Sequence, residues 1–194
     1  MRIPAALAHA VLALTLALAM GAAQAATPTK FEPTMQVQGT PLQLNGAGTR
    51  YKAIFKVYDM GLYTAKHVST PEELLALPGP KRLQFTALRE LPGTDLGRLF
   101  IKGLSENSSN EMVQKHTIST TRFIEIFSGK SKLLPGETFA MEFLPGKGTQ
   151  FYIVGKPQGE PVGDAEFFSM VLKIWVGNSP ADSSLKDALL GVER

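Results

Sequence analysis

The chain has 194 residues, of which 44% are apolar and 19% charged, and its 20 Lys and Arg against 17 Asp and Glu give a formal net charge of +3. This length predicts one domain with a sizeable core. The absence of cysteine excludes a disulfide framework, a thiol nucleophile and a thiolate metal site. Because lysines and arginines are scattered singly, the sequence predicts no nucleic-acid binding.

The first 25 residues differ from the rest of the chain. They combine Arg2, a long apolar run and a small-residue end at Ala23-Gln24-Ala25, which predicts a secretory signal peptide over residues 1–25. An uncleaved N-terminal anchor is the alternative. We therefore expect residues 26–194 to form one domain that is periplasmic or secreted, with no transmembrane segment after signal removal.

The next region is rich in strand signals. Residues 34–45 predict two short alternating strands around Gly39-Thr40-Pro41, and residues 49–66 predict one long strand that follows a glycine-rich turn. On such a strand one face would carry Tyr51, Ala53, Phe55 and Val57.

A short helix over 71–77 is predicted by its capping residues. Thr70 offers a hydroxyl cap, Pro71 occupies the first helical position and Glu73 completes a capping box. Residues 81–90 then alternate as a strand.

Helical spacing dominates the middle of the chain. It predicts two amphipathic helices, one over Leu96–Leu104 and one over Met112–Phe127, separated near Ser108-Ser109.

The C-terminal part predicts a β-hairpin within 137–154 and two further helices, over 164–176 and near 184–190. Because strict βαβ alternation is absent, the fold class is α+β, with an antiparallel sheet and helices gathered on one face.

Familiar cofactor motifs are incomplete. A dinucleotide fingerprint beginning at Gly46 would need a third glycine where Tyr51 stands, and residues 146–149 imitate a phosphate loop only in part. His67 and His116 lie far apart in the sequence with no ligand four residues away. We therefore predict no cofactor and no metal site.

Several short motifs, in this order, resemble the chalcone isomerase-like family over about residues 34–191. They are Gly46-x-Gly48-x-Arg50, Phe55-Lys56-Val57-Tyr58-x-x-Gly61-Leu62-Tyr63, Leu88-Arg89-Glu90-Leu91, Gly163-x-x-Glu166-Phe167, Ile174-Trp175-Val176-Gly177-x-x-Pro180 and Leu185-Lys186-x-x-Leu189-Leu190-Gly191. With the signal peptide, they look like an exported bacterial branch. The resemblance implies an open-faced β-sandwich, a large antiparallel sheet with a layer of helices on one face.

The resemblance does not carry over the catalytic residues of the isomerases. It implies that Arg50 matches their oxyanion-stabilising arginine, whereas the positions of their other hydrogen-bonding groups fall on Tyr58, Leu96, Gly103 and Ile174. Each lost donor can weaken oxyanion stabilisation by about 3 kcal/mol. We therefore name no catalytic residue and do not expect chalcone cyclisation.

The pairing of Arg50 with Tyr58 resembles that of fatty-acid-binding members of the family. A guanidinium and a phenol suit a carboxylate, and apolar Leu96, Phe100, Ile174 and Trp175 would enclose its tail. The predicted ligand is a small lipophilic carboxylate such as a fatty acid, bound without turnover. A straight strand would separate Arg50 from Tyr58 by about 26 Å, so the site needs a bend, a bulge or another tyrosine, Tyr51 or Tyr63.

Two other functions stay open. One is an isomerase or lyase that stabilises an enolate with Arg50 and moves protons with Tyr58 or Lys52. The other is a periplasmic scaffold with a closed cavity that binds a protein partner. The binder and the enzyme require an open cavity at Arg50, and the scaffold requires a closed one.

Overall fold

The structure, a computed structural model, describes residues 29–192, so the predicted signal peptide lies outside the described residues. Its strands are β1 (Thr34–Val37), β2 (Thr40–Lys52), β3 (Phe55–Thr64), β4 (Lys81–Ala87), β5 (Leu91–Pro92), β6 (Lys132–Leu133), β7 (Thr138–Leu144), β8 (Gly148–Ile153) and β9 (Lys156–Pro157). Its helices are α1 (Pro71–Ala76), α2 (Gly93–Asn107), α3 (Asn110–Lys115), α4 (Thr117–Ser128), α5 (Ala165–Val176) and α6 (Ser183–Leu189).

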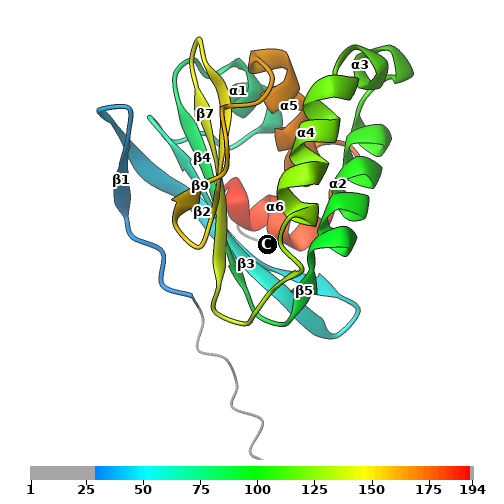
Figure 1. The fold of residues 1–194 in the computed structure, drawn as a ribbon. Coiled ribbons are helices and arrows are strands. Elements are labelled where there is room, and N and C mark those ends of the chain that lie inside the picture. Colours follow the sequence, from blue (N-terminus) through cyan, green and yellow to red (C-terminus); the bar gives the residue numbers. More distant parts are fainter. Residues whose placement is uncertain (1–28, 193–194) are drawn as a thin grey trace, which may run out of the picture.

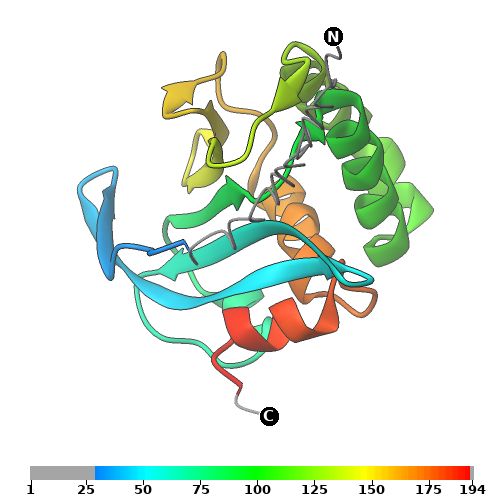
Figure 2. The ribbon, with the colours of Figure 1, turned by 90° about the horizontal axis from the view of Figure 1, so that it is seen from below.

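Seven strands form one curled antiparallel sheet in the order β1-β2-β3-β4-β7-β8-β9. Helices α2, α4 and α5 cover one face of this sheet (Figure 1). Seen from below, α6 runs along β2 and β3 (Figure 2). The predicted α+β architecture, with helices on one face of an antiparallel sheet, is confirmed. Within residues 29–192 no helix is both long and apolar enough to cross a membrane.

The two faces of the sheet differ in chemistry, as the alternation in β4 predicts. Leu83, Phe85 and Ala87 are buried beneath the helices. The intervening positions point to the other face, where Arg82 forms an ion pair with Glu142. The apolar face therefore carries the main core, between the sheet and the helices.

The prediction of one long strand over 49–66 is wrong. The chain reverses after Lys52 in a two-residue turn at Ala53-Ile54, which joins β2 to β3 as a hairpin. Ala53 adopts a left-handed φ of 53°, a conformation that glycine or asparagine usually supplies. Because neither residue of the turn is a typical turn former, the sequence pattern concealed it.

The glycine-rich segment before Arg50 is a strand, although it resembled a turn. A Cβ on Gly46 would lie 2.2 Å from the Ala188 carbonyl oxygen, and one on Gly48 would lie 2.7 Å from the Ala188 Cβ. The absent side chains therefore let α6 pack directly on the backbone of β2. The pattern that suggested a phosphate turn is a packing surface.

Asn45 joins three parts of the chain beside this surface. Its side-chain amide donates to the Val68 and Leu189 carbonyl oxygens at 3.0 and 2.7 Å, and its carbonyl oxygen accepts from the Val68 amide at 2.8 Å. Asn45 is buried at a register shift of the β2–β3 pair. It therefore holds α6 and the segment after β3 against the sheet.

The predicted Thr70 cap of α1 is present, and α5 and α6 begin with side-chain caps of the same kind. The side chains of Thr70, Asp164 and Asp182 accept hydrogen bonds from backbone amides in the first turns of α1, α5 and α6. In the middle of the chain, where two helices are predicted, the structure contains three. The helix α3 begins after the Ser109 cap, near the predicted break, and the second predicted helix is divided at His116, whose backbone is not helical, into α3 and α4.

Lys81 is buried near the C-terminal end of α1, where its ammonium donates to the Leu77 carbonyl oxygen, and burial lowers its pKa from 10.5 to about 8. Between these two values the unfolded chain keeps a proton that folded Lys81 has lost. The free energy of unfolding should therefore rise with pH across this window, by up to about 3 kcal/mol. Urea denaturation near pH 7 and near pH 10, compared with Lys81→Met, measures the rise. Parallel pH dependence in the two proteins would contradict the prediction.

Candidate ligand-binding site

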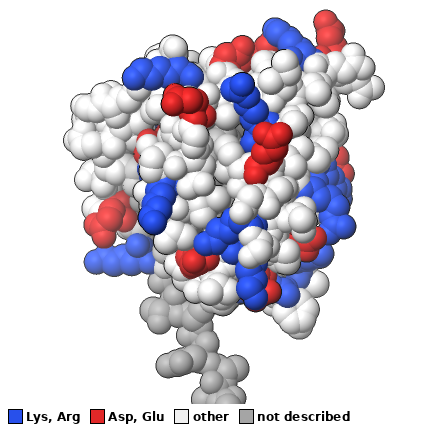
Figure 3. All heavy atoms as spheres, viewed as in Figure 1, with Lys and Arg blue, Asp and Glu red and all other residues white. Residues whose placement is uncertain are grey.

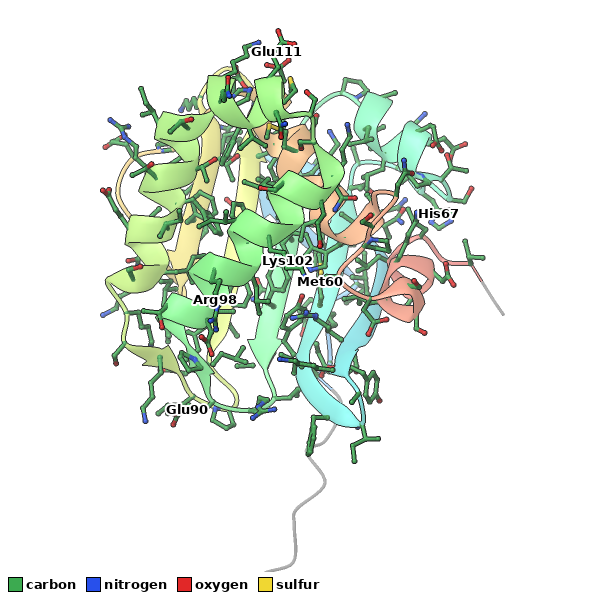
Figure 4. The ribbon with its side chains drawn as sticks, turned by 90° about the vertical axis from the view of Figure 1, so that its right-hand side faces the viewer. Met60, His67, Glu90, Arg98, Lys102 and Glu111 are labelled. Atoms are coloured by element: carbon green, nitrogen blue, oxygen red, sulfur yellow. The ribbon has the colours of Figure 1, made fainter. Side chains whose placement is uncertain are left out.

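A cavity of about 180 Å³ lies between the helical layer and the apolar face of the sheet. We call it the inner cavity. It is lined by Arg50, Tyr58, Leu96, Leu99, Phe100, Lys102, Gly103, Glu106, Phe123, Phe127, Phe139, Met141, Ile174, Trp175, Ser179, Pro180 and Ala181. Figure 4 shows α2 beside the β2–β3 hairpin, with Lys102 labelled on the helix. The side chains of Lys102 and Glu106 are exposed, so the cavity reaches the surface along α2.

The hairpin brings Arg50 and Tyr58 together. They are direct partners in the β2–β3 register, next to a bulge, and the guanidinium carbon of Arg50 lies 5.6 Å from the centroid of the Tyr58 ring. The separation expected for a straight strand is therefore wrong. The alternative tyrosines are not at the site, since Tyr51 is exposed and Tyr63 donates to the Glu32 carbonyl oxygen within a second, smaller hydrophobic cluster.

Trp175 fixes the position of the Tyr58 phenol. The indole N–H donates to the phenol oxygen at 2.7 Å, and both side chains are buried. Burial raises the pKa of Tyr58 above its usual value of 10.0, although the nearby Arg50 charge acts to lower it. The phenol therefore keeps its proton at neutral pH. Among the described residues this O–H has no acceptor, so it can donate to a ligand.

Arg50 also has an unused donor. Its Nε is buried without a hydrogen-bond partner among the described residues, and within the same part of the chain the guanidinium forms no ion pair. A buried unmatched donor is unfavourable by about 1–3 kcal/mol. Arg50 and Tyr58, which both line the inner cavity, thus each carry one unmatched donor.

Apolar and aromatic side chains form the rest of the inner cavity. Leu96, Phe100, Ile174 and Trp175, predicted to enclose a tail, all line it. Sequence reasoning missed the deeper wall of Phe123, Phe127, Phe139 and Met141, although the helical spacing of the two phenylalanines on α4 placed them on a core face. Gly103 keeps α2 close to α5, because a Cβ there would lie 2.8 Å from Ile174 Cγ2.

A second hollow of about 160 Å³ adjoins the inner cavity, and we call it the outer hollow. The two share Arg50, Leu96 and Leu99. The outer hollow is more polar, since its lining adds Lys52, Val57, Arg89, Glu90, Leu91, Pro92 and Asp95. Arg50 therefore stands where an apolar cavity meets a charged entrance.

The structure also gathers polar groups that the sequence did not place together. Ligand atoms of His116, Asp164 and Glu166 lie within 4.8 Å of one another. However, the Lys115 ammonium is 2.5 Å from Glu166, and one Asp164 oxygen caps α5. These contacts occupy the carboxylates, so the cluster is explained as an ion-paired helix junction.

Known proteins share this architecture. A fatty-acid binding protein of Arabidopsis thaliana matches the structure with a TM-score of 0.64 at 15% sequence identity, covering 84% of this chain and 92% of that chain. At this identity the likeness shows a shared fold. No curated protein sequence matches the chain. The sequence model of the chalcone isomerase-like family matches residues 23–191, nearly the whole length, and the chain therefore belongs to the chalcone isomerase-like family.

Proposed function

We propose that this protein binds a small lipophilic carboxylate, of the fatty-acid class, without chemical turnover. The carboxylate accepts hydrogen bonds from Arg50 and Tyr58, and its tail occupies the inner cavity. Two unmatched donors, on two residues that line one apolar cavity, are the observation that carries this proposal. The fatty-acid binding protein with the same fold gives it further support.

Charge and hydrogen bonding favour an anion at this place. Hydrogen bonds that involve an ionised partner contribute about 1.5–3 kcal/mol each, more than neutral ones. A carboxylate would satisfy the buried Arg50 Nε, which has no partner among the described residues. Glu106 is the only carboxylate in the lining of the inner cavity, and it is exposed beside Lys102. The site is therefore better supplied with donors than with a base, which favours binding over proton abstraction.

The size of the inner cavity limits the tail. Its volume of about 180 Å³ exceeds the roughly 150 Å³ that accommodates benzene, and is below the roughly 300 Å³ at which pockets for larger ligands begin. We therefore expect chains of about six to eight carbons to fill it.

Titration calorimetry with straight-chain carboxylates from butanoate to hexadecanoate tests the proposal. Each added methylene should tighten binding about fourfold until the cavity is full, and longer chains should gain little. Primary alcohols of the same chain lengths are the matched control, and they should bind at least about tenfold more weakly because they carry no charge. Equal affinity for alcohols, or no binding of any carboxylate, would overturn the proposal.

An exported location, periplasmic or secreted, is part of the same proposal. It is supported by the sequence of residues 1–25 alone. The intact mass of the natural protein, beginning at residue 1 or at residue 26, decides it.

A further inference from the structure

The end of the β2–β3 hairpin is unusually apolar for an exposed turn. We call residues 51–56 the hairpin tip. Tyr51, Ile54 and Phe55 are 44%, 84% and 59% exposed, and together they make up a third of the nine large apolar side chains that are exposed among the described residues. Figures 1 and 4 show this hairpin projecting at the lower end of the sheet. Three such side chains on one turn form a local apolar surface.

Cations without ion-pair partners surround these side chains. Lys52 and Lys56 belong to the hairpin tip, and the Arg89 guanidinium carbon lies 5.8 Å from the Phe55 ring centroid. None of the three forms an ion pair with another described residue, whereas neighbouring Glu90 is paired with Lys132. Several Lys and Arg side chains gather around this end of the molecule in Figure 3. The apolar tip is therefore framed by free positive charge.

We propose that the hairpin tip docks the protein on a lipid surface that contains anionic lipids. Apolar and aromatic side chains enter the headgroup region while lysine and arginine interact with anionic headgroups, each contributing about 1 kcal/mol near such a surface. A projecting two-residue turn is convex and narrow, and a stable protein interface buries about 800 Å² on each partner. The shape and charge of the tip thus fit a bilayer surface better than a protein partner.

The hairpin tip lies next to the outer hollow, so docking on a bilayer would bring the ligand site close to the lipid surface. Lys52 and Arg89 belong both to the charged surroundings of the tip and to the lining of the outer hollow. The outer hollow meets the inner cavity at Arg50, Leu96 and Leu99. A lipophilic anion leaving the bilayer would therefore pass from the tip to Arg50 over a short, positively charged route.

Sedimentation with vesicles of phosphatidylcholine and phosphatidylglycerol tests the proposal. The unmodified protein should bind these vesicles, bind pure phosphatidylcholine vesicles less, and dissociate as salt is raised. The double variant Lys52→Gln/Lys56→Gln should bind about 10- to 30-fold more weakly. A second double variant, Ile54→Ser/Phe55→Ser, should lose about tenfold or more. Because all four positions are exposed, both double variants should have the same thermal unfolding midpoint as the unmodified protein.

Matched controls lie away from the hairpin tip. Ile118 on α4 is 73% exposed, and Lys147 is exposed in the turn between β7 and β8, at the opposite end of the sheet (Figure 1). Ile118→Ser and Lys147→Gln should bind vesicles like the unmodified protein. Arg50→Ala should also keep vesicle binding, so the docking and the carboxylate site are tested separately. The proposal would be overturned if the unmodified protein did not bind the vesicles, or if the tip and control variants lost vesicle binding equally. In the first case a protein partner would be the remaining occupant of the hairpin tip.

Discussion

Arg50→Ala is expected to weaken carboxylate binding by about 100-fold or more, while the free energy of unfolding changes by no more than about 1 kcal/mol. The binding loss follows from removing the charged donor that is assigned to the carboxylate, a change of about 3 kcal/mol or more. Titration calorimetry and urea denaturation of the same preparations measure the two quantities.

The small stability change has its own physical reason. In the free protein the buried Nε of Arg50 has no hydrogen-bond partner among the described residues, so its removal relieves an unfavourable burial. Its contact with the Tyr58 ring, at 5.6 Å from the centroid, contributes an opposing term of about 0.5–2 kcal/mol. These two contributions to the free energy of unfolding have opposite signs and similar size, so they largely cancel.

Arg82→Ala is the matched control, because it changes the same residue type on the opposite face of the sheet. Arg82 forms an ion pair with Glu142 and lies over the Tyr152 ring, away from the inner cavity. This variant should lose stability and keep carboxylate binding, the reverse of Arg50→Ala. If Arg50→Ala lost stability and kept binding instead, Arg50 would be a structural residue.

Asn45→Ala is expected to reduce the free energy of unfolding by about 4 kcal/mol. The substitution leaves the Val68 amide and the carbonyl oxygens of Val68 and Leu189 without the side chain that binds them in a buried place. Each unmatched group is unfavourable by about 1–3 kcal/mol, and such values are at the upper end of the range for single substitutions. Urea denaturation measures the total, and faster amide exchange in α6 would localise it.

Gln43→Ala supplies the control for Asn45. Gln43 lies on β2 two residues away and is exposed, so its removal should change the free energy of unfolding by less than about 0.5 kcal/mol. A loss below about 1 kcal/mol for Asn45→Ala would mean that α6 is held mainly by its apolar contacts.

Local patterns predicted those parts of the fold that depend on neighbouring residues. The alternation of Leu83, Phe85 and Ala87 gave the buried face of β4, and Thr70 marked the start of α1. The turn at Ala53-Ile54 was missed because it contains no usual turn residue. Gly46 and Gly48 indicated a turn because their role depends on α6, which lies far along the chain. Information of that kind is absent from any short window of sequence.

The candidate site divides in the same way. Family resemblance indicated Arg50 and Tyr58, and their cross-strand pairing explains how the two can reach one ligand. The bond from Trp175 to Tyr58 depends on how α5 packs on the sheet, and the shared border of the two cavities depends on how α2 does, so neither was predictable. Residue types suggested what the site could bind, and tertiary packing determines where the donors point.

The packing of α6 on the glycines of β2 also affects the order in which parts of the molecule can fold. Asn45 and Leu189 are hydrogen-bonded although 144 positions separate them in the chain. During synthesis the longest described strand, β2, is made well before its partner helix α6. Contacts between such distant positions slow folding. The glycine surface of β2 therefore stays uncovered until α6 has been made, and a chain shortened before residue 183 would leave the backbone of this strand exposed.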